Sequence, residues 1–199
     1  VNYVPEKGKL YYIKYGPFTL ATVRPETKLG DTALAVNPND KRYRQYVRQE
    51  IEIDSVDNNV PISDAPKLKN IKIKVVADEA ADQEFGTGVI KVTPAHDMTD
   101  FEIGQRHNLP SVKVIDERGK MTENAGVRYE GMKVAEARKQ IVKDLQELGL
   151  IQKIDDYEHN IARCDRCNSI IEPLPSEQWF LKVSELAKLA KEAIVKQEV

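Results

Sequence analysis

The sequence has no long hydrophobic run and no surplus of charge of either sign. Its 199 residues contain no apolar stretch near the roughly 20 residues that a helix needs to cross a bilayer, so no membrane-spanning segment is expected. Lysine and arginine number 30 against 32 aspartate and glutamate, which gives a net charge of −2. This balance excludes a general basic surface. A nucleic acid, if one binds, is expected to be held locally or mainly by another part of the protein.

Cysteine is scarce: only Cys164 and Cys167 are present, spaced as C-x-x-C. So few cysteines argue against a secreted disulfide framework and favour a reducing, cytoplasmic compartment. The chain starts at Val1 without methionine or a signal peptide, so we expect a fragment of a longer protein. The two cysteines supply half of a zinc knuckle, but for the other half only His159 is nearby and no second pair exists. We expect a turn in a ribbon there, with zinc at Cys164 and Cys167 as the weaker alternative.

The pattern of apolar and polar residues predicts an α+β fold that is strand-rich over its first two thirds. Apolar runs predict strands at residues 10–16, 18–23, 32–37, 51–56, 69–78, 89–93 and 111–116. Helical spacing predicts a short helix within 40–50, one opening at Asp97, a long one over 133–150 capped by Gly149, and an amphipathic one over 183–199. We expect the strands to close into a barrel-like core with a few peripheral helices.

Polar side chains crowd the junction at residues 86–110, where a predicted strand stops at Pro94. The junction collects Lys91, Thr93, His96, Asp97 and Asp100. The spacing Asp97-x-x-Asp100 is typical of a helix cap. A cap does not explain Lys91 and Thr93, which point to the same side of the strand. It also does not explain Gly86 and Gly88, glycines that allow a close approach of the backbone.

A second polar group follows another predicted strand, in the segment "TVRPETKLGDT" at residues 22–32. It contains Arg24, Glu26, Thr27 and Asp31. Alone it is typical of an ordinary loop with a proline at a turn. Together with the first group, it could form the opposite wall of one pocket.

The segments "TVRPETKLGDTALAV", "GTGVIKVTPAHDMTDFEIGQRHNLP" and "ARCDRCNSIIEPLPSEQWF" resemble the editing domain, or connective peptide, inserted into class I valyl-tRNA synthetases. The resemblance covers nearly the whole chain in the same order. Leucyl enzymes usually have apolar residues in place of Lys91 and Thr93, and isoleucyl enzymes tend to carry Trp-Thr in place of Glu26-Thr27. The synthetic signatures His-Ile-Gly-His and Lys-Met-Ser-Lys-Ser are absent, so the resemblance implies proofreading rather than amino-acid activation.

The resemblance implies a single editing domain over 1–199. Within it, residues 1–15 and 156–182 would form the ribbon to a synthetic core, and 183–199 the terminal helix. The implied reaction is hydrolysis of the ester between threonine and the 3′ acceptor end of tRNA(Val). The implied protein is a monomer that does not bind a membrane. Editing itself would need no cofactor and no catalytic metal, whereas the parent synthetase would use ATP and magnesium.

The resemblance also implies a role for each polar residue. Asp100 would bind the ammonium group of threonine, Asp97 would accept from its hydroxyl, and Lys91 with Thr93 would complete that recognition. Lys91 would also stabilise charge on the ester carbonyl, and Thr27 would orient the attacking water. Arg24 is suited to a phosphate or to the terminal ribose and adenine. His96 fits either a general base or a packed structural histidine.

Two other functions are compatible with parts of this pattern. A non-catalytic module could bind the tRNA acceptor end, but it would be expected to cluster lysine and arginine with exposed aromatic residues. An isoleucyl-type editor would hydrolyse valyl esters, and its pocket would need an apolar floor in place of Lys91 and Thr93.

Overall fold

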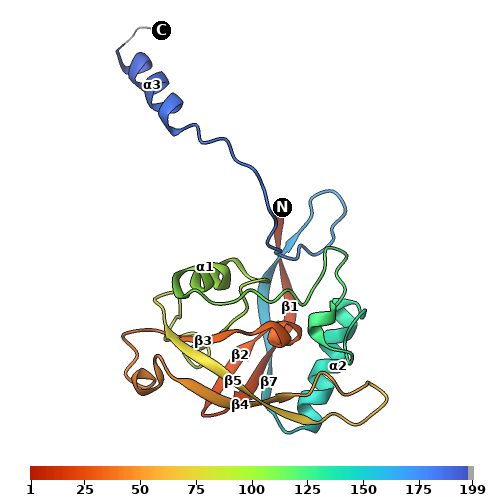
Figure 1. The fold of residues 1–199 in the computed structure, drawn as a ribbon. Coiled ribbons are helices and arrows are strands. Elements are labelled where there is room, and N and C mark those ends of the chain that lie inside the picture. The colour runs from red at the N-terminus through yellow and green to blue at the C-terminus, as the bar shows by residue number, and fades with distance from the viewer. Residues whose placement is uncertain (197–199) are drawn as a thin grey trace.

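The computed structural model describes residues 1–196, and its strands form two separate sheets (Figure 1). The first sheet has the order β2–β1–β7, all antiparallel, and contains β1 (Asn2–Tyr15), β2 (Phe18–Thr22) and β7 (Ile151–Arg163). The second has the order β4–β5–β3–β6 and contains β3 (Ala33–Val36), β4 (Glu50–Val56), β5 (Leu68–Ala77) and β6 (Val89–Val92). Only β3 and β5 run parallel. The α+β, strand-rich class is confirmed.

The helices lie around the sheets and at the C-terminal end of the chain (Figure 1). In the described part of the chain, three are α-helices: α1 (Met98–His107), α2 (Val134–Glu147) and α3 (Ser184–Val195). Three more within residues 1–196 are short 3-10 helices: η1 (Pro25–Gly30), η2 (Arg44–Tyr46) and η3 (Glu123–Ala125). The helix expected over 183–199 is therefore present as α3, while residues 197–199 lie outside the described part. Gly149 follows the end of α2 with a φ of 68°, the left-handed conformation expected after a helix.

The strand predicted at residues 111–116 is wrong. The segment makes only an isolated bridge between Ile115 and Met121. The amides of Val114 and Ile115 donate to Nε2 of His96, so they are not available to a neighbouring strand. A buried side chain has replaced the ladder partner that an apolar run normally requires.

The expected closure into a barrel is also not observed among residues 1–196. The edge strands β2 and β6 lie close to each other, but they share no backbone ladder. Beside them, the hydroxyl of Thr87 in the loop before β6 donates to the carbonyl of Thr19 on β2. Both strands are short, and the two sheets meet there as open edges.

Two clusters of buried apolar residues hold these elements together. The larger one lies between the two sheets and α2, and Tyr15, Leu20, Leu34, Ile53 and Ile141 are among its most buried members. The smaller one lies under α1 and joins Ile103 to Ala33, Ala35 and Val92. Gly104 lets α1 approach closely, because a Cβ there would lie 2.9 Å from Cγ of Pro94. The middle of α1 therefore packs closely against the turn that follows β6.

A long antiparallel ribbon connects the sheets to the C-terminal segment (Figure 1). β1 and β7 pair from Asn2 with Arg163 to Ile13 with Ile151. The assignment of residues 1–15 and 156–182 as a link to a synthetic core stays a prediction. Within residues 1–196, no helix has both the length and the apolar character needed to span a membrane.

Candidate functional site

The two polar groups predicted from the sequence meet at one pocket between the open sheet edges. The pocket has a volume of about 260 Å³ and lies between the end of β2, η1, the end of β6 and the start of α1. It is lined by Ala21, Thr22, Val23, Arg24, Thr27, Ile90, Lys91, Thr93, His96, Asp97, Thr99 and Asp100. All seven site residues proposed from the resemblance are among these, so the tertiary structure brings them together.

Lys91 occupies the centre of the polar side of the pocket. Its Nζ donates to the hydroxyl oxygens of Thr27 and Thr93, each at 2.7 Å. The Thr27 hydroxyl in turn donates to the carbonyl of Arg24 at 3.0 Å. The Thr93 hydroxyl donates to Oδ1 of Asp31 at 2.7 Å. Because carbonyl and carboxylate oxygens only accept, both threonine protons are used internally, and each hydroxyl can offer a ligand only a lone pair.

The two carboxylates at the start of α1 are arranged differently from each other. Asp97 is the N-cap, and its Oδ1 accepts from the amide of Asp100 at 3.0 Å, which confirms the capping interpretation. Asp100 is 8% exposed, and its Oδ2 accepts from the amide of Thr93 at 2.8 Å. Burial raises the pKa of Asp100 to about 6, although Lys91 and the Thr93 amide oppose this. A buried carboxylate with one oxygen still available is a strong attractor for a cation.

His96 lies at the back of the pocket with a structural contact. It is 1% exposed, and its Nε2 accepts from the amide of Val114 at 2.8 Å. Burial and, next, the charge of Arg24 lower the pKa of His96 to about 4, so the ring is neutral near pH 7. This geometry supports the packed, hydrogen-bonded alternative for His96, because the nitrogen that would act as a base already accepts from the backbone.

Arg24 lines the pocket, but its guanidinium is already engaged. Nη1 donates to the carbonyl of His96 at 2.9 Å, and Nη2 pairs with the carboxylate of Glu172 from the C-terminal segment. Nε lies 3.5 Å from Oε1 of Glu26, which is fully buried and is held by two bonds from Arg138. A phosphate that uses Arg24 must therefore displace Glu172, a competition that the sequence did not indicate.

Several residues of this site have no role that the sequence predicts. Asp31 is visible there only as a member of a polar segment, and Tyr15 and Glu172 do not stand out at all. Asp31 contacts both Lys91 and Thr93, and Tyr15 donates to Asp31 at 2.5 Å. For Tyr15 the only available signal was a hydroxyl within an apolar strand pattern.

The glycines at 86 and 88 serve the packing of the chain rather than a ligand. Gly86 has a φ of 58°, and a Cβ there would lie 2.9 Å from Cβ of Ala21 on β2. Gly88 has a φ of 80° and packs against the side chain of Arg42 and the backbone of Gln83. Both glycines let the loop before β6 lie against neighbouring segments.

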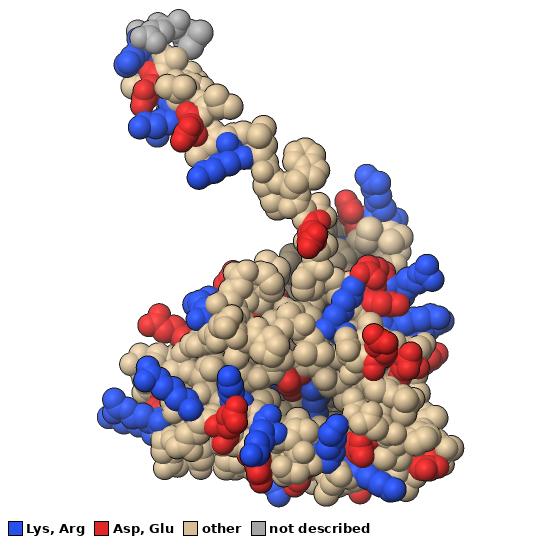
Figure 2. Space-filling model, in the orientation of Figure 1, with Lys and Arg blue, Asp and Glu red and all other residues tan. Residues whose placement is uncertain are grey.

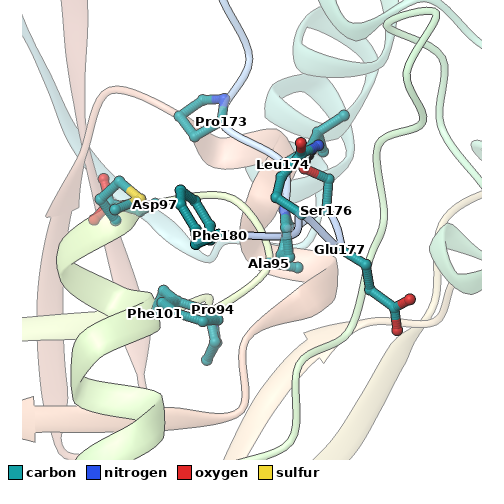
Figure 3. Close-up of a pocket in the computed structure, with 12 residues that line it drawn as sticks. Pro94, Ala95, Asp97, Phe101, Pro173, Leu174, Ser176, Glu177 and Phe180 are labelled. Carbon is teal, nitrogen blue, oxygen red and sulfur yellow. Dashed lines mark hydrogen bonds between the residues drawn. The ribbon is translucent and has the colours of Figure 1, made fainter. Parts of the chain in front are cut away.

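A second, larger hollow adjoins the site on the far side of Asp97 (Figure 3). Its volume is about 830 Å³, and it lies between the start of α1 and residues 173–180 of the C-terminal segment. Figure 3 shows Pro94, Ala95 and Phe101 on one side and Pro173, Leu174 and Phe180 on the other. This lining is mainly apolar, so the smaller pocket with its ammonium and carboxylates is the better candidate for chemistry.

The C-x-x-C motif forms a turn beyond the end of β7. The amide of Asn168 donates to the carbonyl of Cys164, and the amide of Cys164 donates to the carbonyl of Ser169. Both cysteines are free thiols, and hydrogen bonds from Ser169 lower the pKa of Cys167. Among residues 1–196, no group of three or more His, Cys, Asp or Glu side chains is placed to hold a metal ion. The expected turn is present.

Charge on the visible face of the molecule is mixed (Figure 2). Lysine and arginine alternate with aspartate and glutamate across it, and no large field of one sign is present there. This distribution fits the near balance of charges in the sequence.

Comparison with known proteins relates the whole chain to one group of enzymes. It is 46% identical to a valine–tRNA ligase of Carboxydothermus hydrogenoformans and 44% identical to that of Thermotoga maritima, over 100% of this chain and 22% of each relative. The valine–tRNA ligase of Aquifex aeolicus is 47% identical over 93% of this chain and 17% of the relative. The chain thus spans about a fifth of the length of these relatives. No family model matches the chain.

One solved structure is distantly similar to the chain. It is the ternary complex of Agrobacterium radiobacter K84 LeuRS with tRNA and LeuAMS, which matches at a TM-score of 0.42 and 15% identity over 92% of this chain and 28% of that chain. That likeness is too distant to carry an argument. The relatives named above are similar over essentially every residue that forms the sheets, the pocket and the ribbon. The chain therefore belongs to the valine–tRNA ligase family, in which it is the inserted editing domain, or connective peptide.

Proposed function

We propose that this domain hydrolyses threonine mistakenly esterified to tRNA(Val), as the proofreading segment of a longer ligase. The observation that carries the proposal is the meeting of Lys91, Thr93, Asp100 and Thr27 on one pocket of about 260 Å³. The pocket is small enough for one amino-acid side chain, and it offers an ammonium, two hydroxyl lone pairs and a buried carboxylate. Editing by hydrolysis needs no cofactor or metal on this account, whereas ATP and magnesium would serve the synthetic part of the ligase.

The polar side of the pocket, formed by Lys91, Thr93 and Asp100, supports threonine rather than valine as the substrate. Valine and threonine have nearly the same shape, and a hydrophobic pocket separates them weakly; for valyl-tRNA synthetases themselves this limit is known to be about 100-fold. A second site must then recognise the hydroxyl group. A valine side chain would leave the remaining lone pair of the buried Thr93 oxygen without a donor, at a cost of roughly 1–3 kcal/mol. An isoleucyl-type editor for valyl esters would need the opposite, apolar lining.

The proposed mechanism uses positioning and charge rather than a covalent intermediate. The free oxygen of Asp100 binds the ammonium group of the substrate, and the threonine hydroxyl donates to Thr93 or Asp97. Water held by Thr27 attacks the ester carbonyl, and Lys91 stabilises the negative charge that forms on its oxygen. The bond to the ribose oxygen then breaks. The proton lost by water ends on that oxygen, which yields free threonine and uncharged tRNA.

The acceptor end of the tRNA would approach along Arg24. The side chain lies at the rim of the pocket, 25% exposed, where it can reach a phosphate or the terminal adenosine once Glu172 is displaced. Most other tRNA contacts would come from the remaining four fifths of the ligase. We propose a cytoplasmic, monomeric enzyme.

The test is deacylation by the full-length ligase that contains this domain, with threonyl-, valyl- and isoleucyl-tRNA as substrates. We expect rapid hydrolysis of the threonyl ester only, and loss of that activity in Asp100→Ala and Lys91→Ala. Asp54→Ala, which changes an exposed carboxylate on β4, is the matched control and should hydrolyse normally. Preferential clearance of valyl-tRNA would indicate an isoleucyl-type editor. Tight tRNA binding without any hydrolysis would indicate a binding module.

A further inference from the structure

Asp31 lies next to the pocket without lining it, and both oxygens of its carboxylate are bonded. Its side chain is 2% exposed. Oδ1 accepts from the Thr93 hydroxyl at 2.7 Å and lies 3.5 Å from Nζ of Lys91. Oδ2 accepts from the hydroxyl of Tyr15 at 2.5 Å. Asp31 therefore contacts two residues of the site from behind and is itself tied to the core.

The position of Asp31 is fixed by the fold on both sides. Tyr15 ends β1 and is 1% exposed, and burial followed by the charge of Asp31 raises its pKa, so it keeps its proton and stays a donor. Nζ of Lys28 lies over the face of the Tyr15 ring, 3.4 Å from its centroid, and packs against it. Gly30 allows the close approach of the turn, because a Cβ there would lie 2.9 Å from the carbonyl oxygen of Val112 and 3.2 Å from Cγ2 of Thr93.

We infer that Asp31 is a positioning residue that sets the direction of the hydrogen bonds in the pocket, with Tyr15 as its anchor. The inference rests on the proposed function and deepens it. Asp31 accepts a hydrogen bond from the Thr93 hydroxyl, and the Thr93 oxygen therefore presents a lone pair to the substrate. By attracting Lys91, it keeps two of the three ammonium protons on Thr27 and Thr93 and leaves one for the ester.

This arrangement accounts for selectivity at the level of single protons. A Thr93 oxygen that can only accept binds a substrate hydroxyl as a donor, and it makes no hydrogen bond to a methyl group in the same place. Without Asp31 the Thr93 hydroxyl can rotate and donate into the pocket. The wall then loses its fixed polarity, and the threonyl and valyl side chains become harder to distinguish.

The experiment compares Asp31→Ala, Asp31→Asn and Tyr15→Phe in the full-length ligase, with threonyl-tRNA(Val) and valyl-tRNA(Val) as probes. We expect Asp31→Ala to lower kcat/KM for the threonyl ester on the order of 10- to 100-fold, the effect of losing a buried bond to a charged group, with no fall for the valyl ester. The loss should appear in kcat, because KM reports mainly the contacts of the whole tRNA. Asp31→Asn keeps an acceptor for Thr93, so its kcat/KM for the threonyl ester should fall less. The kcat/KM of Tyr15→Phe should fall least.

The ratio of the two rates separates positioning from folding. A variant that is merely less folded loses both activities in the same proportion, so its threonyl-to-valyl ratio stays that of the wild type. An unchanged ratio in Asp31→Ala would overturn the inference. Should that variant fail to fold, the ratio is measured in Asp31→Asn and Tyr15→Phe, whose side chains keep nearly the original volume, and an unchanged ratio in both would overturn the inference equally.

A second measurement does not depend on hydrolysis. In the isolated domain, the ammonium of Lys91 should give a slowly exchanging ¹⁵N signal in nuclear magnetic resonance, and this signal should be lost in Asp31→Ala and kept in Asp54→Ala. Should the wild-type ligase leave threonyl-tRNA intact while this signal behaves as expected, the proposed function fails and the positioning role stands. A Lys91 signal that is unaffected by Asp31→Ala removes the positioning role, whatever the ligase hydrolyses.

Discussion

Replacing Asp100 by asparagine should strongly slow editing and, at neutral pH, make the domain more stable. The asparagine side chain has almost the same shape, and its oxygen can still accept from the amide of Thr93. It has no negative charge for the substrate ammonium, so hydrolysis of threonyl-tRNA should fall on the order of 100-fold, as for the loss of a charge-assisted bond. The gain in stability arises because the wild type must ionise a buried carboxylate.

The size of that gain follows from the shift of the Asp100 pKa from 3.8 to about 6. A raised pKa means that the folded state holds its proton more tightly than the unfolded state, so the native chain loses stability as the pH rises through this window. The penalty is about 1 kcal/mol near pH 4.5 and about 3 kcal/mol near pH 7.5, at 1.36 kcal/mol for each pKa unit. The stability of Asp100→Asn relative to the wild type should therefore rise by about 2 kcal/mol between these pH values.

The assay is urea unfolding of both proteins at several pH values between about 4.5 and 7.5. The lowered pKa of His96 has the opposite sign, because its unfolded state binds the extra proton, so its contribution grows as pH rises from about 4 to 6.5. His96 is present in both proteins, so its contribution cancels in their difference. The measured quantity is the free energy of unfolding of Asp100→Asn minus that of the wild type. This reasoning would be refuted if that difference did not change with pH, or if it fell between about pH 4.5 and pH 7.5. Asp54→Asn on β4 gives the baseline.

Three further outcomes are expected. Asp144→Ala should lower the free energy of unfolding by about 3–5 kcal/mol, because it leaves the guanidinium of Arg128, which is 2% exposed, without its buried partner. The folded variant should edit normally. A loss of less than about 1 kcal/mol in urea unfolding would contradict the predicted role of this ion pair. Glu172→Gln should free Arg24 and tighten tRNA binding by about 1 kcal/mol, or roughly fivefold, with a steeper salt dependence in filter binding; unchanged affinity would mean that Arg24 does not contact the tRNA. The isolated domain should deacylate threonyl-tRNA little at moderate salt, because most tRNA contacts lie elsewhere in the ligase, and robust turnover there would show that it binds tRNA unaided.

The elements with strong local signals were predicted well. The helix starting after Asp97 and the helix ending before Gly149 both have their caps where the sequence placed them. The strands at β4 and β5 follow from alternating apolar residues that face one core. These features depend on interactions within a few residues along the chain, and a single sequence contains that information.

The failures share a different cause. The apolar run at 111–116 is no strand, because the amide of Val114 donates to the side chain of His96, which lies 18 residues earlier in the chain. The sheets stay open because β2 and β6 form no backbone ladder, and the loop before β6 contacts β2 through the hydroxyl of Thr87 instead. Arg24 is paired with Glu172, which lies 148 residues further along the chain. No periodicity or motif predicts contacts between residues so far apart in the sequence.

The sequence by itself determined the residue types of the candidate site and the two segments that carry them, since hydroxyl, ammonium and carboxylate groups at the ends of strands are visible without coordinates. Only the tertiary structure decided which proton each of these groups holds and which groups are free for a ligand. The reason is that burial and hydrogen-bond direction depend on partners brought in by distant elements. Tyr15 from β1 and Asp31 after η1 act on Lys91 and Thr93 in this way, and neither contact exists until the two sheets have packed.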